Sequence, residues 1–427
     1  MIAGIFRCHT RDGSPHAQSY IAGLLSRAER KNMERLTEEL PEIRYENLQQ
    51  FLSSSPWKSD DLWRLVAQRA VECFDPKAEI SLLIDESGFA KKGQRSAGVA
   101  RQYNGRLGKV DNAQVGVFSA LSQGHRCVLT GARLYLPEEW TQDPARCEFA
   151  GIPKDQREFK TKNEIAWSLI EQAESNGIRF EWVGADEAYG RDQDLLLKIS
   201  GLGKLFMVDV AHNQQVWETC PPGNVRPDGV KASGSRAVAA LWEGGRKQAR
   251  NCVLRSGENG KVKIKFWRKR VWIWPPSSEI AMEVWLCISV RADGTIKYSI
   301  SNAPEECSRE SLAHKQGQRY FIERALEDGK SELGMGEYQA RKWIAWHHHM
   351  ALVGAAMIFA LIERQRVEGN SPLTSVRDVV EMVAWYFAES RTAEEVVDQI
   401  KSRHKRRAQS MKFKLSKQLA EKRNMRL

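Results

Sequence analysis

The amino-acid sequence predicts an α/β fold in which a mixed β-sheet is flanked by helices on both faces. One observation is the order of elements between residues 81 and 210, where three strand-like segments precede a helix, a strand, a helix and a last strand. Strands that follow one another directly tend to pair antiparallel, whereas strands separated by helices pair parallel, so this order gives a mixed sheet. The other observation is a strand-rich block at 211–302, after which helices return. We therefore expect an all-β insertion to interrupt the α/β core.

Residues 1–78 are expected to form a helical N-terminal region. Apolar residues recur at helical spacing in ENLQQFLSSSPWKSDDLWRLVAQRAVECF. The run Ser59-Asp60-Asp61 provides a good N-cap before LWRLVAQRAV.

The core elements follow in order. The segment SLLID (81–85) is a short apolar run that ends in an acid, as a buried strand does. The next two strands, 112–122 and 126–137, are joined by a Gln-Gly-His turn and predict a hairpin. A helix at 161–176 that stops at Gly177, a strand at 178–186, a helix at 191–200 and a strand at 204–210 complete the series. This is the order of a ribonuclease-H-like core that is interrupted before its last helix.

The segment 211–302 is expected to be a folded β-rich insertion. Short β-like stretches there are separated by Gly, Pro and Asn, and an unstructured loop of this length is uncommon in a compact domain. Helices are predicted again at 316–333, at about 337–367 and from Pro372 to the end. The chain then divides into a helical N-terminal region (1–78), a first core part (79–210), the insertion (211–302), a second core part with the third acid (303–370) and a helical C-terminal region (371–427).

The positive charge is concentrated at the C-terminus. The 427 residues carry a net charge of +11, and the stretch 401–427 holds eleven Lys or Arg and one Glu, hence +10. A basic tail on a nearly neutral body favours a polyanionic partner, most simply nucleic acid, with Lys405, Arg406 and Arg407 as contacts. The alternative is a solvated tail that only improves solubility.

Cysteine and histidine placement excludes several other classes of protein. The eight Cys never come closer than 20 residues, so neither a zinc ribbon nor a dense disulfide framework is predicted. His347, His348 and His349 are consecutive on a predicted helix and cannot form one metal site. The N-terminus lacks a signal-peptide pattern, and the longest apolar run, 350–362, is too short to span a bilayer. These features predict a cytoplasmic protein without a membrane partner.

Two aspartates and one of two glutamates are candidates for metal chemistry. Asp85 and Asp186 each close a predicted central strand, at the end where open α/β sheets place ligands. Either one could instead begin a turn or cap a helix. Glu323 and Glu327 share one stripe of a predicted helix with Arg319 and Lys330, although an exposed salt-bridged helix would look the same. Three carboxylates would suit Mg²⁺ or Mn²⁺ better than zinc.

The sequence resembles bacterial insertion-sequence transposases of the DDE type, most closely the insertion-sequence 701 family. The matching stretches are LLIDESGFAKKG, VGVARQYNGRLGKVDNAQVGVF, LYLPEEWTQDPARCEFAGIP, VGADEAYGRD, IKYSISNAP and RYFIERALEDGKSELGMGEYQARKWIAWHHHMAL. The resemblance implies a ribonuclease-H-like core with a β-rich insertion between the second and third acids. It assigns the catalytic, metal-holding acids to Asp85, Asp186 and Glu323 rather than Glu327.

The family's signature helix, R-x3-E-x6-K, is matched by Arg319, Glu323 and Lys330. One departure is Gln316, which stands where related families carry a Tyr three residues before that Arg. By resemblance, Arg319 and Lys330 would position phosphates beside the scissile bond.

The implied function is that of a transposase with DNA as its partner. It would bind the terminal inverted repeats of its element, cleave them with Mg²⁺ (Mn²⁺ also being accepted) and join the ends to target DNA, with a homodimer in the DNA complex. The helices within 30–75 would contain a helix-turn-helix. Two other classes stay open: another ribonuclease-H-like nuclease, against which the insertion and the signature helix argue, and a domesticated DNA-binding regulator that no longer cleaves.

Further DNA contacts are expected in two places. Lys91, Lys92 and Arg95 follow the first acid and could bind phosphates near the active site. In KVKIKFWRKR, period-2 alternation places Lys263, Lys265 and Trp267 on one face, opposite the apolar residues, so this Lys/Trp face should be open. Because related hairpin-forming transposases hold a flipped base with an aromatic of the insertion, our hypothesis is that Trp267 does so here.

Overall fold

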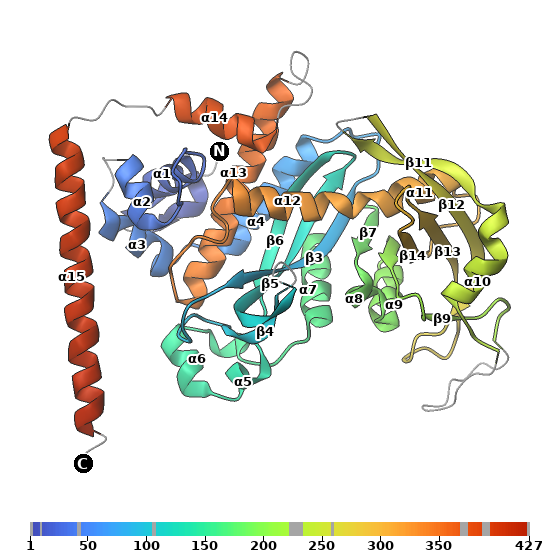
Figure 1. The fold of residues 1–427 in the computed structure, drawn as a ribbon, viewed down its shortest axis with the longest axis horizontal. Coiled ribbons are helices and arrows are strands. Elements are labelled where there is room, and N and C mark those ends of the chain that lie inside the picture. The colour runs from blue at the N-terminus through green and yellow to red at the C-terminus, as the bar shows by residue number, and fades with distance from the viewer. Residues whose placement is uncertain are drawn as a thin grey trace.

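The computed structural model describes residues 3–8, 11–40, 44–104, 108–221, 234–257, 260–367, 375–386 and 393–424. One long sheet runs through the molecule and helices cover both of its faces (Figure 1). The N-terminal helices are α1 (Ser14–Leu24), α2 (Met33–Glu39), α3 (Tyr45–Ser53) and α4 (Ser59–Glu72). They follow a short 3₁₀ turn, Ala3–Phe6, and the small ribbon of β1 (Arg7–Cys8) and β2 (Arg11–Asp12). The predicted helical N-terminal region is thus present.

The core elements appear in the predicted order. The core strands are β3 (Ser81–Ala90), β4 (Ala100–Asn104), β5 (Lys109–Gln123), β6 (Arg126–Leu134), β7 (Trp182–Ala185) and β8 (Leu205–Asp209). The helices among them are α5 (Glu138–Thr141), α6 (Pro144–Ala150), α7 (Lys162–Ser175), α8 (Glu187–Gly190) and α9 (Gln193–Gly201). A capping box between Thr161 and Glu164 begins α7, and Gly177, at φ +66°, follows its end.

The strand order confirms the ribonuclease-H-like core. In space the core strands run β6-β5-β3-β7-β8. The pairs β6·β5 and β5·β3 are antiparallel, while β3·β7 and β7·β8 are parallel. The first three strands thus form a meander, and each of the two later strands reaches its place through a helical crossover.

The insertion differs from the prediction. Its strands are β9 (Gln215–Val216), β10 (Arg236–Ala237), β11 (Arg250–Gly257), β12 (Gly260–Ile273), β13 (Met282–Val290) and β14 (Ile296–Ser301), and it also contains the helix α10 (Val238–Gly245). It is therefore not all-β. Strands β11 to β14 do not form a separate sheet either, because β14 pairs with β8 and extends the core sheet to ten strands. Without β14, the edge of β8 would expose unpaired backbone N–H and C=O groups. In the structure β14 pairs with this edge.

Contacts in the sheet show which helices cover which face. A Cβ at Gly116 of β5 would lie 2.7 Å from Trp346, whereas a Cβ at Gly131 of β6 would lie 3.0 Å from Leu169 of α7. The face with Gly116 is covered by the helices that follow the insertion: α11 (Arg309–Gln318), α12 (Tyr320–Ser331) and α13 (Trp343–Val367). α7 covers the opposite face.

Helix α13 lies at the centre of the molecule. It packs against β6, α4 and α1 (Figure 1). It is long and apolar enough to cross a membrane, but 89% of its most apolar window is buried inside the protein. It therefore has the burial of a core helix in a soluble protein.

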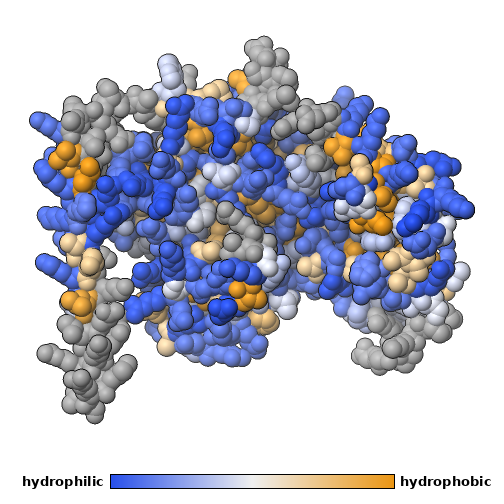
Figure 2. Space-filling model, viewed as in Figure 1, coloured by the Kyte–Doolittle hydropathy of each residue, from blue (hydrophilic) through white to orange (hydrophobic). Residues whose placement is uncertain are grey.

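The C-terminal region contains α14 (Val376–Tyr386) and the long α15 (Ala393–Asn424), which projects alongside α2 and α3 (Figure 1). Arg403 pairs with Glu38 at 2.8 Å, and Arg407 pairs with Glu34 at 2.9 Å. Figure 2 shows that polar side chains cover most of this face of the molecule. Part of the basic tail is thus attached to acids of α2.

Candidate active site

Three neighbouring parallel strands each carry an aspartate at the same level of the sheet, within β3, directly after β7 and at the end of β8. The prediction that the first of these strands ends at Asp85 is wrong, because β3 continues to Ala90. Ile84 of β3 pairs with Ala185 of β7, and Ala185 pairs with Val208 of β8. The residues that follow these three are Asp85, Asp186 and Asp209. Carboxyl ends of parallel strands form the usual ligand-binding edge of such sheets.

The pleat of β3 directs Asp85 toward the helices that carry the third acid. Asp85 lies opposite Phe118 of β5, whose ring packs against Trp346 of α13 at 6.1 Å between centroids. Glu86 alternates to the other face, where its carboxylate pairs with Lys162 of α7 at 2.6 Å. The strand continues past Asp85, so only one of these two adjacent acids faces α12.

Asp186 has a structural function as well as a position at the strand end. Its Oδ1 accepts a hydrogen bond from the backbone N–H of Ala188 at 2.9 Å, and Asp186 is the N-cap of α8. The sequence left open whether Asp186 follows a strand or caps a helix, and in the structure it does both.

Arg319 connects the third acid to the strand ends. It lies at the junction of α11 and α12; the helix predicted at 316–333 covers α12 and only the last residues of α11. Its guanidinium is 2.6 Å from Glu323, 2.9 Å from Asp209 and 3.9 Å from Asp85. One buried cation thus contacts carboxylates from two strands and one helix.

These side chains line a cleft of about 820 Å³. The cleft is bounded by Asp85, Asp186, Arg319 and Glu323, and also by Lys330 of the signature helix. The structure thus brings together all three acids that the sequence singled out, with both basic residues of the motif.

The electrostatics of the cleft reflect the crowding of negative charge. Burial, followed by repulsion from Asp186, raises the pKa of Asp85 to about 7. Burial also raises the pKa of Asp186. For Arg319, burial lowers the pKa, but the surrounding carboxylates, Asp209 first, outweigh it and the net pKa is raised. The site therefore favours a cation.

The donors fit a hard divalent ion in kind. All three acids offer only carboxylate oxygens, which Mg²⁺ and Mn²⁺ prefer. Within the described ranges no three His, Cys, Asp or Glu side chains are already grouped closely enough to hold a metal ion. The Arg319 guanidinium is the positive charge that the acids share in this arrangement.

Glu323 and Glu327 differ as candidates for the third acid. Glu323 is paired with Arg319, whereas Glu327 pairs with Arg324 at 3.4 Å and its side chain is 68% exposed. Both line the cleft. Only Glu323 is linked to the strand-end aspartates.

The basic residues after Asp85 are separated by the structure. Lys91 donates a hydrogen bond to the carbonyl of Tyr338 at 3.1 Å and lies 3.4 Å from the centre of its ring. Burial lowers the pKa of Lys91 to about 7. Lys92 and Arg95 are exposed. Of the three predicted phosphate contacts, Lys91 is held inside the protein, and the other two lie at the surface.

The prediction that Trp267 lies on an open face is wrong. Its side chain is 6% exposed, its ring packs against Trp242 of α10, and its Nε1 donates to Gln248 at 3.3 Å. Helix α10, which the sequence did not predict, covers this part of β12. Lys263 and Lys265 on the same face are exposed as predicted. Burial under α10 removes the base-stacking function that we assigned to Trp267.

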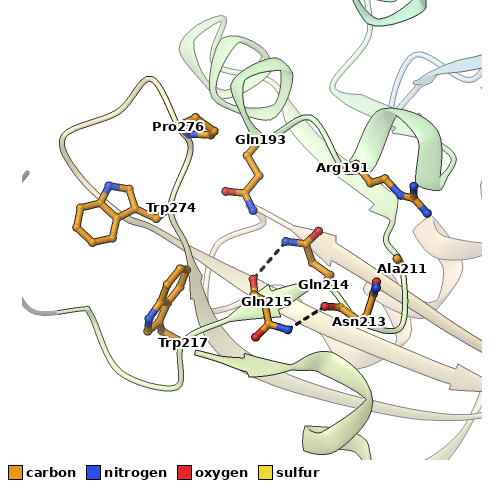
Figure 3. A pocket seen from close by; sticks show the side chains of 9 residues that line it. All are labelled: Arg191, Gln193, Ala211, Asn213, Gln214, Gln215, Trp217, Trp274 and Pro276. Atoms are coloured by element: carbon orange, nitrogen blue, oxygen red, sulfur yellow. Dashed lines mark hydrogen bonds between the residues drawn. The ribbon is translucent and has the colours of Figure 1, made fainter. Parts of the chain in front are cut away.

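The structure has a second hollow, of about 480 Å³ (Figure 3). Its walls include Arg191, at the end of α8, and Ala211, two residues after Asp209. Trp217 and Trp274 form one side, and Gln193 extends toward the hollow from another (Figure 3). The sequence analysis did not identify this hollow, because its residues come from separate segments that carry no common motif.

Asp209 is the residue of the site that the sequence analysis missed. A signal for it existed, because Asp209 is the penultimate residue of the strand predicted at 204–210, near the same strand end at which Asp85 and Asp186 were expected. Its proximity to Arg319, 110 residues later, could not be read from spacing.

The chain is similar to known proteins in sequence and in fold. The chain is 26% identical over 321 residues to the "Probable transposase for insertion sequence element IS701" of Microchaete diplosiphon, covering 74% of each chain. Among solved structures it is similar to the "piggyBac transposase synaptic complex with hairpin DNA", at 10% identity and a TM-score of 0.43, over 93% of this chain and 79% of that one. The family described as DDE superfamily endonuclease matches residues 5–269, which include Asp85 and Asp186. The chain therefore belongs to the DDE superfamily endonuclease family.

Proposed function

We propose that this protein is the transposase of an insertion sequence. It binds the terminal inverted repeats of its element, cleaves the DNA there and joins the freed 3′-hydroxyls to target DNA. The observation that carries the proposal is the convergence of Asp85, Asp186 and Glu323 on one cleft. These acids come from the middle of β3, the end of β7 and helix α12, which are far apart in sequence. The similarity to a probable insertion-sequence transposase supports the choice of substrate.

In this proposal Asp85, Asp186 and Glu323 hold Mg²⁺, with Mn²⁺ as an accepted substitute. Two such ions would activate the attacking oxygen and stabilise the leaving oxygen of a phosphodiester displacement. Arg319 and Lys330 position the phosphate from α12. The cleft is rich in carboxylates, so both positive groups offset the repulsion between these acids and a DNA strand.

DNA outside the cleft is contacted by basic side chains at the surface. Lys92 and Arg95 lie near the catalytic strand, Lys263 and Lys265 on the insertion, and Lys405 on α15, and all of them are exposed. Arg406 lies 5.0 Å from the ring of Tyr45, and Arg407 is paired with Glu34, so these two would exchange partners on binding. Two element ends are brought together by a homodimer in the cytoplasm.

The test is incubation of the purified full chain with DNA that contains cloned element ends and Mg²⁺, followed by mapping of the cuts at nucleotide resolution. We expect cuts at the element boundaries, abolished by EDTA and restored by Mn²⁺. Binding to the ends without any metal-dependent cut would instead indicate a regulator that has kept the fold and lost catalysis.

A further inference from the structure

Asp209 is a half-buried carboxylate whose contacts extend toward the catalytic acids. Its side chain is 16% exposed. Its Oδ2 accepts from Arg319 Nε at 2.9 Å and from Lys297 Nζ at 3.3 Å, and its Oδ1 accepts from Ser299 Oγ at 2.7 Å. These three hydrogen bonds fix the orientation of the carboxylate.

The opposite side of Arg319 faces the metal-holding acids. While Nε of Arg319 donates to Asp209, one terminal nitrogen, Nη2, lies 2.6 Å from Glu323, and the other, Nη1, lies 3.9 Å from Asp85. A guanidinium has five donors in a rigid plane, so fixing Nε also fixes where the terminal nitrogens lie. The guanidinium of Arg319 thus lies between the carboxylates of Glu323 and Asp85.

A chain of hydrogen bonds holds Asp209 from behind. Gln316 Nε2 donates to Ser299 Oγ at 2.8 Å, and Ser299 Oγ donates to Asp209. Ser299 lies directly opposite Asp209 in the β14·β8 register, and both Ser299 and Gln316 are buried. Gln316 is the residue that departs from the pattern of related families, and here it begins this chain of hydrogen bonds.

We propose that Asp209 is a positioning residue for the metal site. It holds Arg319 between Glu323 and Asp85 and balances its charge, and it thereby sets how tightly the catalytic acids bind a divalent cation. The proposal rests on the proposed metal-binding function of these acids.

Two consequences have definite signs. Without the guanidinium, the acids lose a competing cation, so Arg319→Gln should bind the metal more tightly. Without the Asp209 charge, Arg319 retains only the catalytic acids as partners and competes more strongly for them, so Asp209→Asn should bind the metal more weakly. If Asp209 acts through Arg319, this second effect should largely disappear once Arg319 is gone.

The experiment is a double-mutant cycle on Mn²⁺ affinity, measured by electron paramagnetic resonance of free Mn²⁺ with the full chain and no DNA. We expect Asp209→Asn to weaken binding about tenfold when Arg319 is present and about threefold or less in the Arg319→Gln background. Asp194→Asn on α9 removes a matched charge that contacts Ser277 instead, and should leave the affinity unchanged. Equal effects of Asp209→Asn in the two backgrounds would overturn the proposal.

Three further variants keep the result interpretable. Ser299→Ala removes one uncharged hydrogen bond to Asp209 and should weaken Mn²⁺ binding about twofold to threefold, which tests the same chain of contacts if Asp209→Asn fails to fold. Asp209→Glu retains the charge and should recover most of the affinity. Glu323→Gln checks the underlying site: if it leaves Mn²⁺ binding intact, the proposed metal function itself is wrong, whereas a loss in Glu323→Gln with no coupling between Asp209 and Arg319 contradicts only this inference.

Discussion

Asp85, Asp186 and Asp209 lie at one level of three neighbouring strands, yet their surroundings give them different functions. Asp209 is neutralised by Arg319 and Lys297. Asp85 is buried beside Asp186, with Arg319 at 3.9 Å, and its pKa is raised to about 7. A carboxylate at this depth whose charge is only partly compensated costs stability, and proteins tolerate such a cost mainly at functional sites. The pair with the raised pKa values is therefore the better candidate for binding a metal ion.

Amide substitutions test the three acids one at a time. Asp85→Asn, Asp186→Asn or Glu323→Gln should each lower metal-dependent cleavage by at least about a thousandfold, because each removes a charged ligand while the shape is kept. Binding to the element ends should remain nearly unchanged in a gel-shift assay. Metal-dependent cleavage that survives in any one of them would show that the triad is misassigned.

Buried histidines make the free energy of unfolding depend on pH. His347 and His349 of α13 are enclosed, and burial lowers the pKa of each to about 3. Both are neutral in the folded chain, whereas they take up a proton near pH 6.5 when unfolded, so their contribution to stability is complete above pH 6.5 and is lost as the pH falls below it. Each of the two histidines should lower the free energy of unfolding by about 1.4 kcal/mol for each pH unit below 6.5.

The variant His349→Gln isolates one of these contributions. Urea unfolding at pH 7.5 and pH 5.5 should show a smaller loss of stability on acidification in the variant than in the unaltered protein, by about 1.4 kcal/mol. Equal losses in the two proteins would mean that His349 is already protonated in the folded state.

At the scale of elements, the sequence predicts strands better than it predicts what covers them. β3 and β7 were predicted because a short apolar run that ends in an acid is typical of a buried strand, although β3 continues past that acid to Ala90. α10 was not predicted, and therefore the burial of Trp267 was not either: alternation tells which residues of β12 share a face, but not that a helix from another segment covers part of it. β4 was missed because ARQYN is too short and too polar to show a pattern.

Adjacent glycines of α10 test the packing on Trp267. A Cβ at Gly245 would lie 2.3 Å from the indole of Trp267, whereas a Cβ at Gly244 would meet nothing within 4 Å. Gly245→Ala should therefore destabilise the protein by about 1–3 kcal/mol. Gly244→Ala should be neutral or stabilising by up to about 1 kcal/mol, since alanine lowers the entropy of the unfolded chain. Equal unfolding free energies of the two variants would contradict the close contact of α10 with β12.

Helix α15 carries the second prediction at this scale. Truncation after Ile400 should weaken DNA binding broadly with little change in sequence preference. For each phosphate that the tail no longer neutralises, the slope of log K against log salt should flatten by about 0.9. Lys405→Ala should flatten it as well, whereas Arg407→Ala should do so less, because Arg407 is paired with Glu34. A slope unchanged by the truncation would mean that the tail does not touch DNA.

At the scale of the whole molecule, the insertion and the core form one continuous sheet. The β14·β8 pairing places Ser299 opposite Asp209, so a residue of the insertion supports a residue of the cleft. The order of elements and the three predicted acids follow from local patterns and from resemblance. The continuity of the sheet, the position of Asp209 and the pairing of α15 with α2 depend on long-range contacts, which spacing in the sequence does not encode.

The measurement that tests the central claim most directly is metal rescue of a cysteine variant. A thiolate is a poor ligand for Mg²⁺ and a better one for Mn²⁺. Glu323→Cys should therefore cleave a cloned element end in Mn²⁺ and not in Mg²⁺, whereas the matched variant Glu327→Cys, one turn further along α12, should cleave in both. Cleavage by Glu323→Cys in Mg²⁺ at the rate of the unaltered protein would contradict the assignment of Glu323, with Asp85 and Asp186, as the metal-holding centre.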